Sequence, residues 1–243
     1  MQSGALDFGV VLADDAYRSY FGDSPTGQKP NSMVRAISLL QPLPTYLLAR
    51  AGTGIRSVTD LEGRTVAVGP QGSSAFKLGT LVLKAFGVSP ATVKALASRE
   101  VAVKGLRDGT FRRNHAPRLR LPGGVHRNAA ARERRVPGRI DGPPMDACGR
   151  SRPFVRVVVI PRDIYPGQDK IVPTVGIDMM IVCRRDLDER LAYRLTRQLF
   201  EVFPRLARVE ATMRFLNLDD APATPIPLHP GAARYFRERE LSR

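Results

Sequence analysis

The segment GRTVAVGPQGSSAFKLGTLVLKAF, residues 63–86, carries the pattern that decides the fold class. Thr65 to Val68 predicts a short buried strand, because small and β-branched apolar residues follow one another without interruption. A glycine-containing turn comes next, and the apolar residues behind it recur at helical spacing until Gly87. A strand, a tight turn and a helix in direct succession are typical of an α/β protein.

Working outward, the same alternation continues on both sides of this segment. Before it, Ala5 to Leu12 predicts a buried strand, and Asp14 or Asp15 can cap a helix that runs through Tyr17 and Tyr20. Two further strands, residues 34–40 and 46–49, are separated by turn-forming prolines at 42 and 44. A one-turn helix is expected from Ser57.

Behind residues 63–86, a second helix is expected to end at Asp108-Gly109. Residues 155–160 and 174–182 predict strands, and residues 186–206 predict a long amphipathic helix. The alternation of strands and helices predicts mostly parallel sheets covered by helices. The expected inward face of the long helix consists of Leu187, Leu191, Leu195, Leu199 and Phe203.

Residues 112–152 break this pattern. They contain eleven arginines, no lysine and three acidic residues, and therefore hold more than half of the chain's net charge of +15. No helical or strand period is visible in them. A basic face of this kind suggests nucleic-acid binding, because arginines displace counterions from phosphates. The segment has no Phe, Tyr or Trp on which bases could stack, which weighs against that function.

A frameshift is the alternative explanation that we favour over a basic loop, because so long a loop is uncommon inside a compact domain. The run GVHRNAAARERRVPGRID, residues 124–141, can be encoded so that a start one base later reads ESIETLLRESGGYLVELT. That string describes an amphipathic helix, a glycine stop and a strand. The same shift allows the apolar string AAIM from residues 112–116.

The turn GPQGSS, residues 69–74, is the candidate binding motif. Backbone N–H groups at a helix start attract anions, and the hydroxyl groups of Ser73 and Ser74 add donors. An ordinary strand-to-helix turn capped by serine fits the same pattern, so the residues alone leave both interpretations open.

Catalytic and metal-binding constellations are missing from the sequence. The histidines are His115, His126 and His229, and the first two lie in the basic segment, while His229 is expected to pack or to cap a helix. Cys148 and Cys183 lack metal-ligand spacing and are expected to be free thiols, although an oxidising compartment would let them pair. We therefore expect neither enzymatic activity nor a cofactor.

The ordered set of motifs resembles the TAXI-type solute receptors of TRAP transporters. Most specific are YPGQDKIVPTV at residues 165–175 and PLHPGAARYFRE at 227–238. They are accompanied by LDFGVVLADDAYRSY at 6–20, SVTDLEGRTVAVGPQGSSAF at 57–76, LVLKAFGVSP at 81–90 and LRDGT at 106–110. The resemblance covers residues 1–111 and 153–243.

This resemblance implies an α/β, two-lobed type II periplasmic-binding-protein fold without chemistry of its own. Residues 1–50 and 174–243 would form the first lobe, and residues 51–173 would form the second. The implied partners are a small, glutamate-like carboxylate and a TRAP-type membrane permease. The implied ligand-binding residues are Asp14 and Tyr17 in the first lobe, and Gly69, Gln71, Gly72, Ser73 and Ser74 in the second.

Two departures from the family pattern predict a defective copy. Met1-Gln2-Ser3-Gly4 matches a point well inside the first lobe, so we expect an incomplete first lobe. No export signal is visible in these residues, so a family-typical periplasmic location is not expected for the chain as written, which would stay in the cytoplasm. The shifted reading of residues 112–152 is the other departure.

Overall fold

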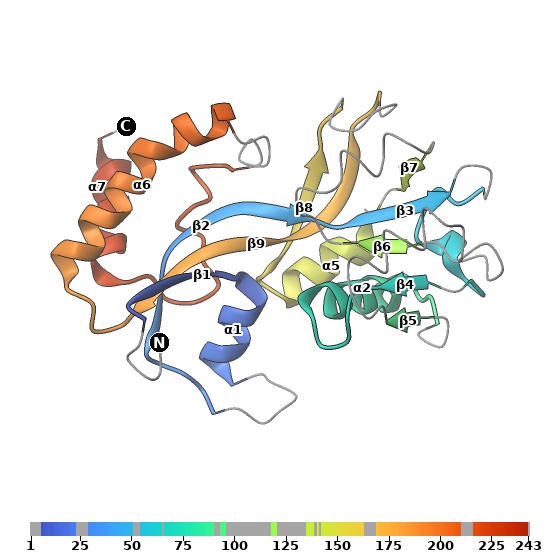
Figure 1. The fold of residues 1–243 in the computed structure, drawn as a ribbon, viewed down its shortest axis with the longest axis horizontal. Helices are drawn as coiled ribbons and strands as arrows, with labels where there is room; N and C mark the ends of the chain where they lie inside the picture. The colour runs from blue at the N-terminus through green and yellow to red at the C-terminus, as the bar shows by residue number, and fades with distance from the viewer. Residues whose placement is uncertain are drawn as a thin grey trace. The chain divides into compact units, whose positions relative to one another are not determined.

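The structure is a computed structural model that describes residues 6–22, 29–50, 54–64, 66–89, 93–95, 118–120, 135–138, 140, 142–162, 169–209 and 216–242. The chain divides into two compact units. Unit 1 combines Met1–Pro42 with Ile177–Arg243, and unit 2 is the intervening segment Leu43–Gly176. The chain passes between them along two long strands, β2 (Val34–Pro44) and β9 (Val172–Arg184). Figure 1 shows the helices and strands of both units.

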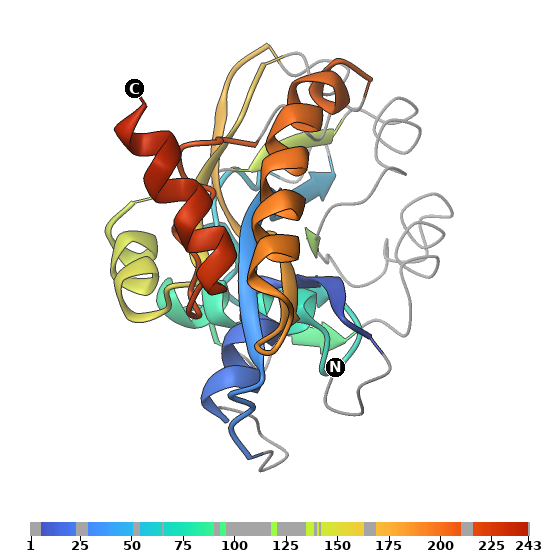
Figure 2. The same ribbon diagram turned by 90° about the vertical axis from the view of Figure 1, so that its left-hand side faces the viewer.

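Unit 1 is organised by the sheet order β1-β9-β2, in which β1 (Phe8–Leu12) pairs antiparallel with β9. Its helices are α1 (Ala13–Phe21), α6 (Glu189–Val209) and α7 (Pro230–Leu241). Helices α6 and α7 lie side by side and pack on the strands (Figure 2). Their shared core contains Ile37, Ile181, Cys183, Ala192, Phe200, Phe203, Ala221, Ala232 and Phe236.

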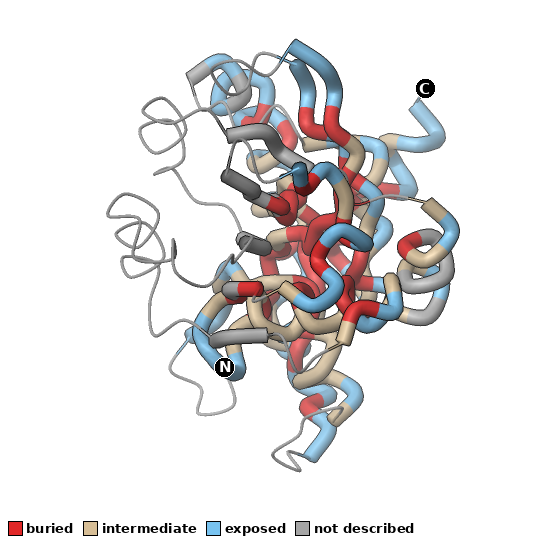
Figure 3. Tube along the Cα trace, turned by 90° about the vertical axis from the view of Figure 1, so that its right-hand side faces the viewer, coloured by how far each residue is buried: buried red, intermediate tan, exposed pale blue. Residues whose placement is uncertain are grey.

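Unit 2 contains a five-stranded sheet of order β5-β4-β6-β3-β7. The bounds are β3 Tyr46–Arg50, β4 Val66–Val68, β5 Val93–Ala95, β6 Arg118–Arg120 and β7 Arg135–Gly138. Strand β8 (Val155–Ile160) pairs with β9. The helical elements are the short η1 (Thr59–Leu61), α2 (Ser74–Ala85) and α5 (Pro143–Ser151). Its buried residues, which Figure 3 colours red, include Leu47, Leu61 and Val158.

The predicted strand, turn and helix of residues 63–86 are confirmed in unit 2. Val66 and Val68 are buried in β4, and α2 buries Leu78, Val82 and Leu83 beneath it. Strand β4 pairs parallel with β5, which follows α2 in the chain. The helical crossover between them explains the parallel pairing, because parallel neighbours need a long connection.

The prediction of mostly parallel sheets is wrong. The pairs β1–β9, β3–β6 and β3–β7 are all antiparallel, and among the registers described here only β4 pairs parallel, with β5 and β6. Strands β1 and β9 come from distant parts of the chain, so no strand–helix–strand crossover fixes their relative direction. The alternation of strands and helices along the sequence therefore did not determine whether neighbouring strands pair parallel or antiparallel.

The prediction of a buried first strand is also wrong. Phe8 and Val10 in β1 are 57% and 55% exposed, and Leu6 just before them is exposed as well. Strand β1 lies at the end of its sheet, and Phe8 and Val10 share the face that the described residues leave exposed. An apolar run alone does not distinguish a buried strand from an edge strand of this kind.

The turn expected at Pro42 and Pro44 is replaced by continuous strand. Strand β2 runs through both prolines to its end. Because β2 lies at the other end of the sheet order β1-β9-β2, proline's missing N–H is tolerated there. Edge position thus overrides the turn preference of proline.

Two helix predictions need smaller corrections. Asp14 and Asp15 lie inside the first turn of α1, and the residue before that turn, Leu12, makes no side-chain cap. The long helix starts later than expected, at Glu189, and Leu191 is 44% exposed rather than inward. Phe203 is buried as expected, and Leu195 and Leu199 pack partly buried against the core.

Part of residues 112–152 forms regular structure, contrary to the expectation that no period exists there. Helix α5 occupies Pro143–Ser151 and buries Met145 completely, and Ile140 is buried and donates its N–H to the carbonyl of Pro173. Prolines at the first helical positions favour a helix start without requiring an apolar period. Most of residues 112–139, and the helix expected to end at Asp108-Gly109, lie outside the described residues.

Cys183 is a free thiol buried in the core of unit 1, so it is not paired with Cys148. Burial raises the pKa of the Cys183 thiol from 9.0 to about 12, because the thiolate would lose its hydration. The thiolate is the reactive form, so at pH 8 its fraction falls by roughly 1000-fold relative to an ordinary cysteine.

We therefore expect Cys183 to resist thiol reagents in the native protein. In a Cys148→Ser variant, labelling with a disulfide reagent at pH 8 should be at least about 100-fold slower than in denaturant. Native labelling at the denatured rate would contradict the burial of this thiol.

Candidate functional site

The start of helix α2 is a serine-capped turn. The Ser73 hydroxyl accepts a hydrogen bond from the Phe76 N–H at 3.2 Å and donates one to the Pro70 carbonyl at 2.6 Å. The Ser73 N–H also donates to the Pro70 carbonyl, which closes the turn. The Ser73 side chain thus stabilises the helix start, which is the role that the cap interpretation predicted.

The two glycines of this turn have different physical requirements. Gly69 lies so close to α2 that a Cβ there would overlap the Cβ of Ala75 and come within 3.0 Å of the Ser73 Oγ. Gly72 has a φ of 81° but open space around it, so its conformation rather than its surroundings favours glycine. Gly69 therefore allows the end of strand β4 to lie close to helix α2. Gly72 leaves the start of the helix open to solvent.

The electrostatics of this helix start favour an anion. The first turn of α2 contains no acidic residue, whereas α1 has Asp14 and Asp15 there and α6 has Glu189. The positive end of the α2 dipole is therefore not offset by a carboxylate of its own first turn. Gln71 and Gly72 are exposed, Ser73 is half-buried, and Ser74 is buried.

Lys77 was not singled out by sequence reasoning. It follows Ser74 by three residues, is half-buried, and its N–H donates to the Ser73 carbonyl as the first bond of the helical ladder. A cation this close to the turn adds positive charge to the helix start. A lysine placed one helical turn after Gly72-Ser73-Ser74 is the pattern from which Lys77 could have been identified.

Asp14 and Tyr17 are placed on α1 in unit 1. Asp14 is buried in the first helical turn, where a carboxylate interacts favourably with the helix dipole. Tyr17 is half-buried, and its ring packs against Phe21 with centroids 4.7 Å apart. The structure thus brings these two residues together on one helix of unit 1. Gly69, Gln71, Gly72, Ser73 and Ser74 come together in unit 2.

His229 is a capping residue, as expected. Its Nδ1 accepts a hydrogen bond from the Gly231 N–H at 3.2 Å, and its side chain is buried at the start of α7. Within the described ranges, no group of three His, Cys, Asp or Glu side chains is arranged to hold a metal ion. No helix among the described residues has both the length and the apolar character to cross a bilayer.

The sequence profile of the NMT1-like family matches residues 1–239, nearly the whole chain. The chain belongs to the NMT1-like family. Members of this family are periplasmic solute-binding proteins of transport systems rather than enzymes.

Solved structures similar to this NMT1-like chain include a TctC solute binding protein from Polaromonas. The two share 11% sequence identity and a TM-score of 0.50, over 96% of this chain and 75% of the other. The second substrate binding domain of GlnP from Lactococcus lactis is 10% identical, with a TM-score of 0.47 over 88% of this chain and 71% of the other. The NMT1-like chain therefore has the α/β periplasmic-binding-protein fold.

Proposed function

We propose that this NMT1-like protein descends from the solute-binding subunit of a TRAP-type transporter, of the TAXI type. Its ligand would be a small organic carboxylate, glutamate-like in character, handed to a membrane permease. The observation that carries this proposal is the start of α2, where a serine-capped, glycine-opened turn has no acidic residue in the first turn. Such a helix start attracts anions through its N–H groups and its dipole.

The proposed lobes follow the family pattern, with residues 1–50 and 174–243 in the first lobe and 51–173 in the second. In this proposal, Asp14 and Tyr17 of α1 contribute the first lobe's side of the site. The turn from Gly69 to Ser74 contributes the second lobe's side. We assign no catalytic step, cofactor or metal to the site.

We also propose that this copy is defective. Strand β6 pairs with both β3 and β4 and is therefore a central strand, yet its sequence is Arg-Leu-Arg. Central strands are normally apolar, since both faces are covered. The shifted reading supports a frameshift further, because its strand YLVEL, at positions 136–140, overlaps strand β7. The burial of Met145 supports a shorter aberrant segment, ending before helix α5.

The exposed apolar side chains of β1 support an incomplete first lobe. Leu6, Phe8 and Val10 together present an apolar face at a sheet edge. In a complete lobe we expect further helices or strands to cover such a face. Native proteins cover apolar edge strands because exposed ones promote aggregation.

The test of the ligand site uses the frame-restored version, in which the shifted reading replaces residues 112–141. Ser73→Asp keeps an oxygen that can cap the helix, adds a carboxylate at the helix start and removes the hydrogen bond to the Pro70 carbonyl. Coulomb repulsion at about 4–5 Å and an effective dielectric constant of ~20 is worth roughly 3–4 kcal/mol. We therefore expect L-glutamate to bind at least about 100-fold more weakly in calorimetry.

Ser73→Asn is the matched control, because asparagine caps equally well and carries no charge. Its affinity should stay within about threefold of the parent. Equal affinities in the two variants would place the ligand site elsewhere, and an equal loss in both would indicate that the hydroxyl rather than the charge matters.

A further inference from the structure

The outer face of helix α6 carries arginines without partners. Arg190, Arg194, Arg205 and Arg208 are exposed, and their guanidinium groups make no ion pair, hydrogen bond or ring contact within the described part of the chain. Arg197, between them, pairs only with Glu201 at 3.2 Å. At 1.5 Å per residue, this basic row extends for about 27 Å along the helix.

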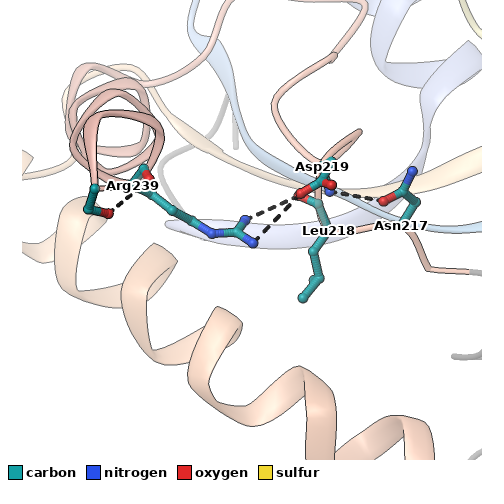
Figure 4. A network of polar contacts seen from close by, with 5 residues as sticks. Asn217, Leu218, Asp219 and Arg239 are labelled. Atoms are coloured by element: carbon teal, nitrogen blue, oxygen red, sulfur yellow. Dashed lines mark hydrogen bonds and ion pairs between the residues drawn. The ribbon is translucent and has the colours of Figure 1, made fainter.

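Arg239 on the neighbouring helix α7 provides a contrast. Its guanidinium group lies 3.8 Å from the Asp219 carboxylate and donates to the Leu218 carbonyl at 3.3 Å (Figure 4). The same group stacks over the Phe200 ring. Through these contacts Arg239 holds the loop that contains Leu218 and Asp219 against helices α6 and α7. The α6 arginines make no comparable contact, so they do not stabilise unit 1 in this way.

The spacing of the α6 arginines opposes helix stability. Arg190 and Arg194 are four residues apart, and Arg205 and Arg208 are three apart, so like charges face each other on the helix surface. Such pairs destabilise a helix by small amounts that salt reduces. Between Arg190 and Arg208, Glu201 is the one acidic residue of the helix, and it pairs with Arg197.

An apolar strip runs beside the arginines on the same helix. Leu191, Val202 and Leu206 are 44%, 45% and 38% exposed, and at 100° per residue they fall within one 60° sector next to the arginine sector. Apolar side chains next to arginines are the composition of a protein interface core with its charged border.

We propose that the outer face of α6, defined by Arg190, Arg194, Arg205, Arg208, Leu191, Val202 and Leu206, docks an acidic protein surface. The partner presents carboxylates opposite the arginine row and an apolar patch opposite the strip. Guanidinium groups suit carboxylates because they donate two parallel hydrogen bonds. This docking surface goes beyond the proposed ligand site and shares no residue with it.

A membrane surface fits these observations less well. Interfacial helices sink their apolar face about 5–10 Å into the lipid, and they carry aromatic anchors. The broad apolar face of α6 is already occupied, since Ala192, Phe200 and Phe203 lie in the core of unit 1. The exposed face offers neither an aromatic residue nor a lysine.

The probe is a synthetic helical peptide with glutamates along one face and leucines along its edge, beside a version with glutamine at every glutamate. We expect the native chain to bind the glutamate peptide and not the glutamine peptide at low salt. Arg194→Glu combined with Arg205→Glu should weaken binding at least about tenfold, because two attractive contacts become repulsive. Val202→Ser should weaken it a few-fold.

The matched control is Arg56→Glu combined with Arg162→Glu, which makes the same charge change at two exposed arginines of unit 2. Its affinity should fall less than about twofold. An equal loss in both pairs would mean that general basicity drives binding and would overturn the proposal. So would tighter binding to phosphatidylglycerol-containing vesicles, or to a DNA duplex, than to the peptide. Thermal unfolding of each variant verifies that the exposed substitutions leave the fold intact.

Discussion

Replacing Gly231 with alanine is expected to destabilise unit 1 by about 3 kcal/mol or more, beyond the ordinary cost of overpacking. Gly231 lies in the first turn of α7, directly against the first turn of α6. A Cβ at this position would overlap the Glu189 carbonyl oxygen and come within 2.8 Å of the Tyr193 nitrogen. Both are backbone atoms, so no side-chain rotation relieves the contact.

The loss is steric and not a loss of the cap. Alanine keeps the backbone N–H that donates to His229 Nδ1. Because the whole chain is expected to have a stability of only about 5–15 kcal/mol, urea unfolding should detect the change as a clearly lower midpoint.

Gly149→Ala is the matched control for this prediction. Gly149 also lies in a helix, α5, but a Cβ there would meet its nearest neighbour, the Val155 carbonyl oxygen, at 3.4 Å. Alanine is the better helix former, so this variant should lie within about 1 kcal/mol of the parent, on either side. Similar midpoints for the two variants would refute the close packing of α7 on α6.

Restoring the reading frame across residues 112–141 is the second change with a large expected effect. A strand that pairs on both sides normally consists of apolar residues, but β6 has the sequence Arg-Leu-Arg. The shifted reading of residues 124–141 supplies an amphipathic helix and an apolar strand, and the burial of one further leucine contributes about 2–5 kcal/mol. A gain of about 4 kcal/mol should raise the midpoint of thermal unfolding by roughly 10 °C for a chain of this size.

The control for frame restoration replaces the same residues with a glycine–serine linker of equal length. This linker removes the arginines but supplies no strand or helix. If the linker version gains as much stability as the restored version, the gain comes from lost charge alone and the frameshift proposal fails.

The positions of helices and strands were predicted from the sequence more accurately than their pairing and their exposure to solvent. The β4–turn–α2 segment follows directly from Val66 to Ser73, because a buried strand, a glycine turn and a serine cap each have a local signature. The capping role of His229 was also accessible, since the proline and glycine behind it mark a helix start. These predictions depend only on neighbouring residues.

The predictions that failed depend on long-range pairing. The exposure of Phe8, the continuous strand through Pro42 and the antiparallel pairing of β1 all follow from which strand lies at a sheet edge. Leu191 is similar, because the helical period fits it to the inner face, while the width of the core decides its exposure. No local pattern encodes such facts.

For the candidate site, the turn from Gly69 to Ser74 was found because its signal is local. The structure shows that close packing requires glycine at position 69, whereas a positive φ favours glycine at position 72. The sequence does not distinguish these two causes. The proposal that Asp14 and Tyr17 share a site with this turn rests on the family resemblance. The sequence contains no pattern for that geometry beyond the resemblance.

The division of the chain into a continuous unit 2 and a split unit 1 also governs the order of folding during synthesis. Every residue of unit 2, Leu43–Gly176, has been made before the second part of unit 1 leaves the ribosome. Ile37 must wait for Phe236, about 200 residues later, to complete the core that they share. The nascent chain therefore holds β1, α1 and β2 unassembled for most of translation, which makes this stretch the natural client of chaperones.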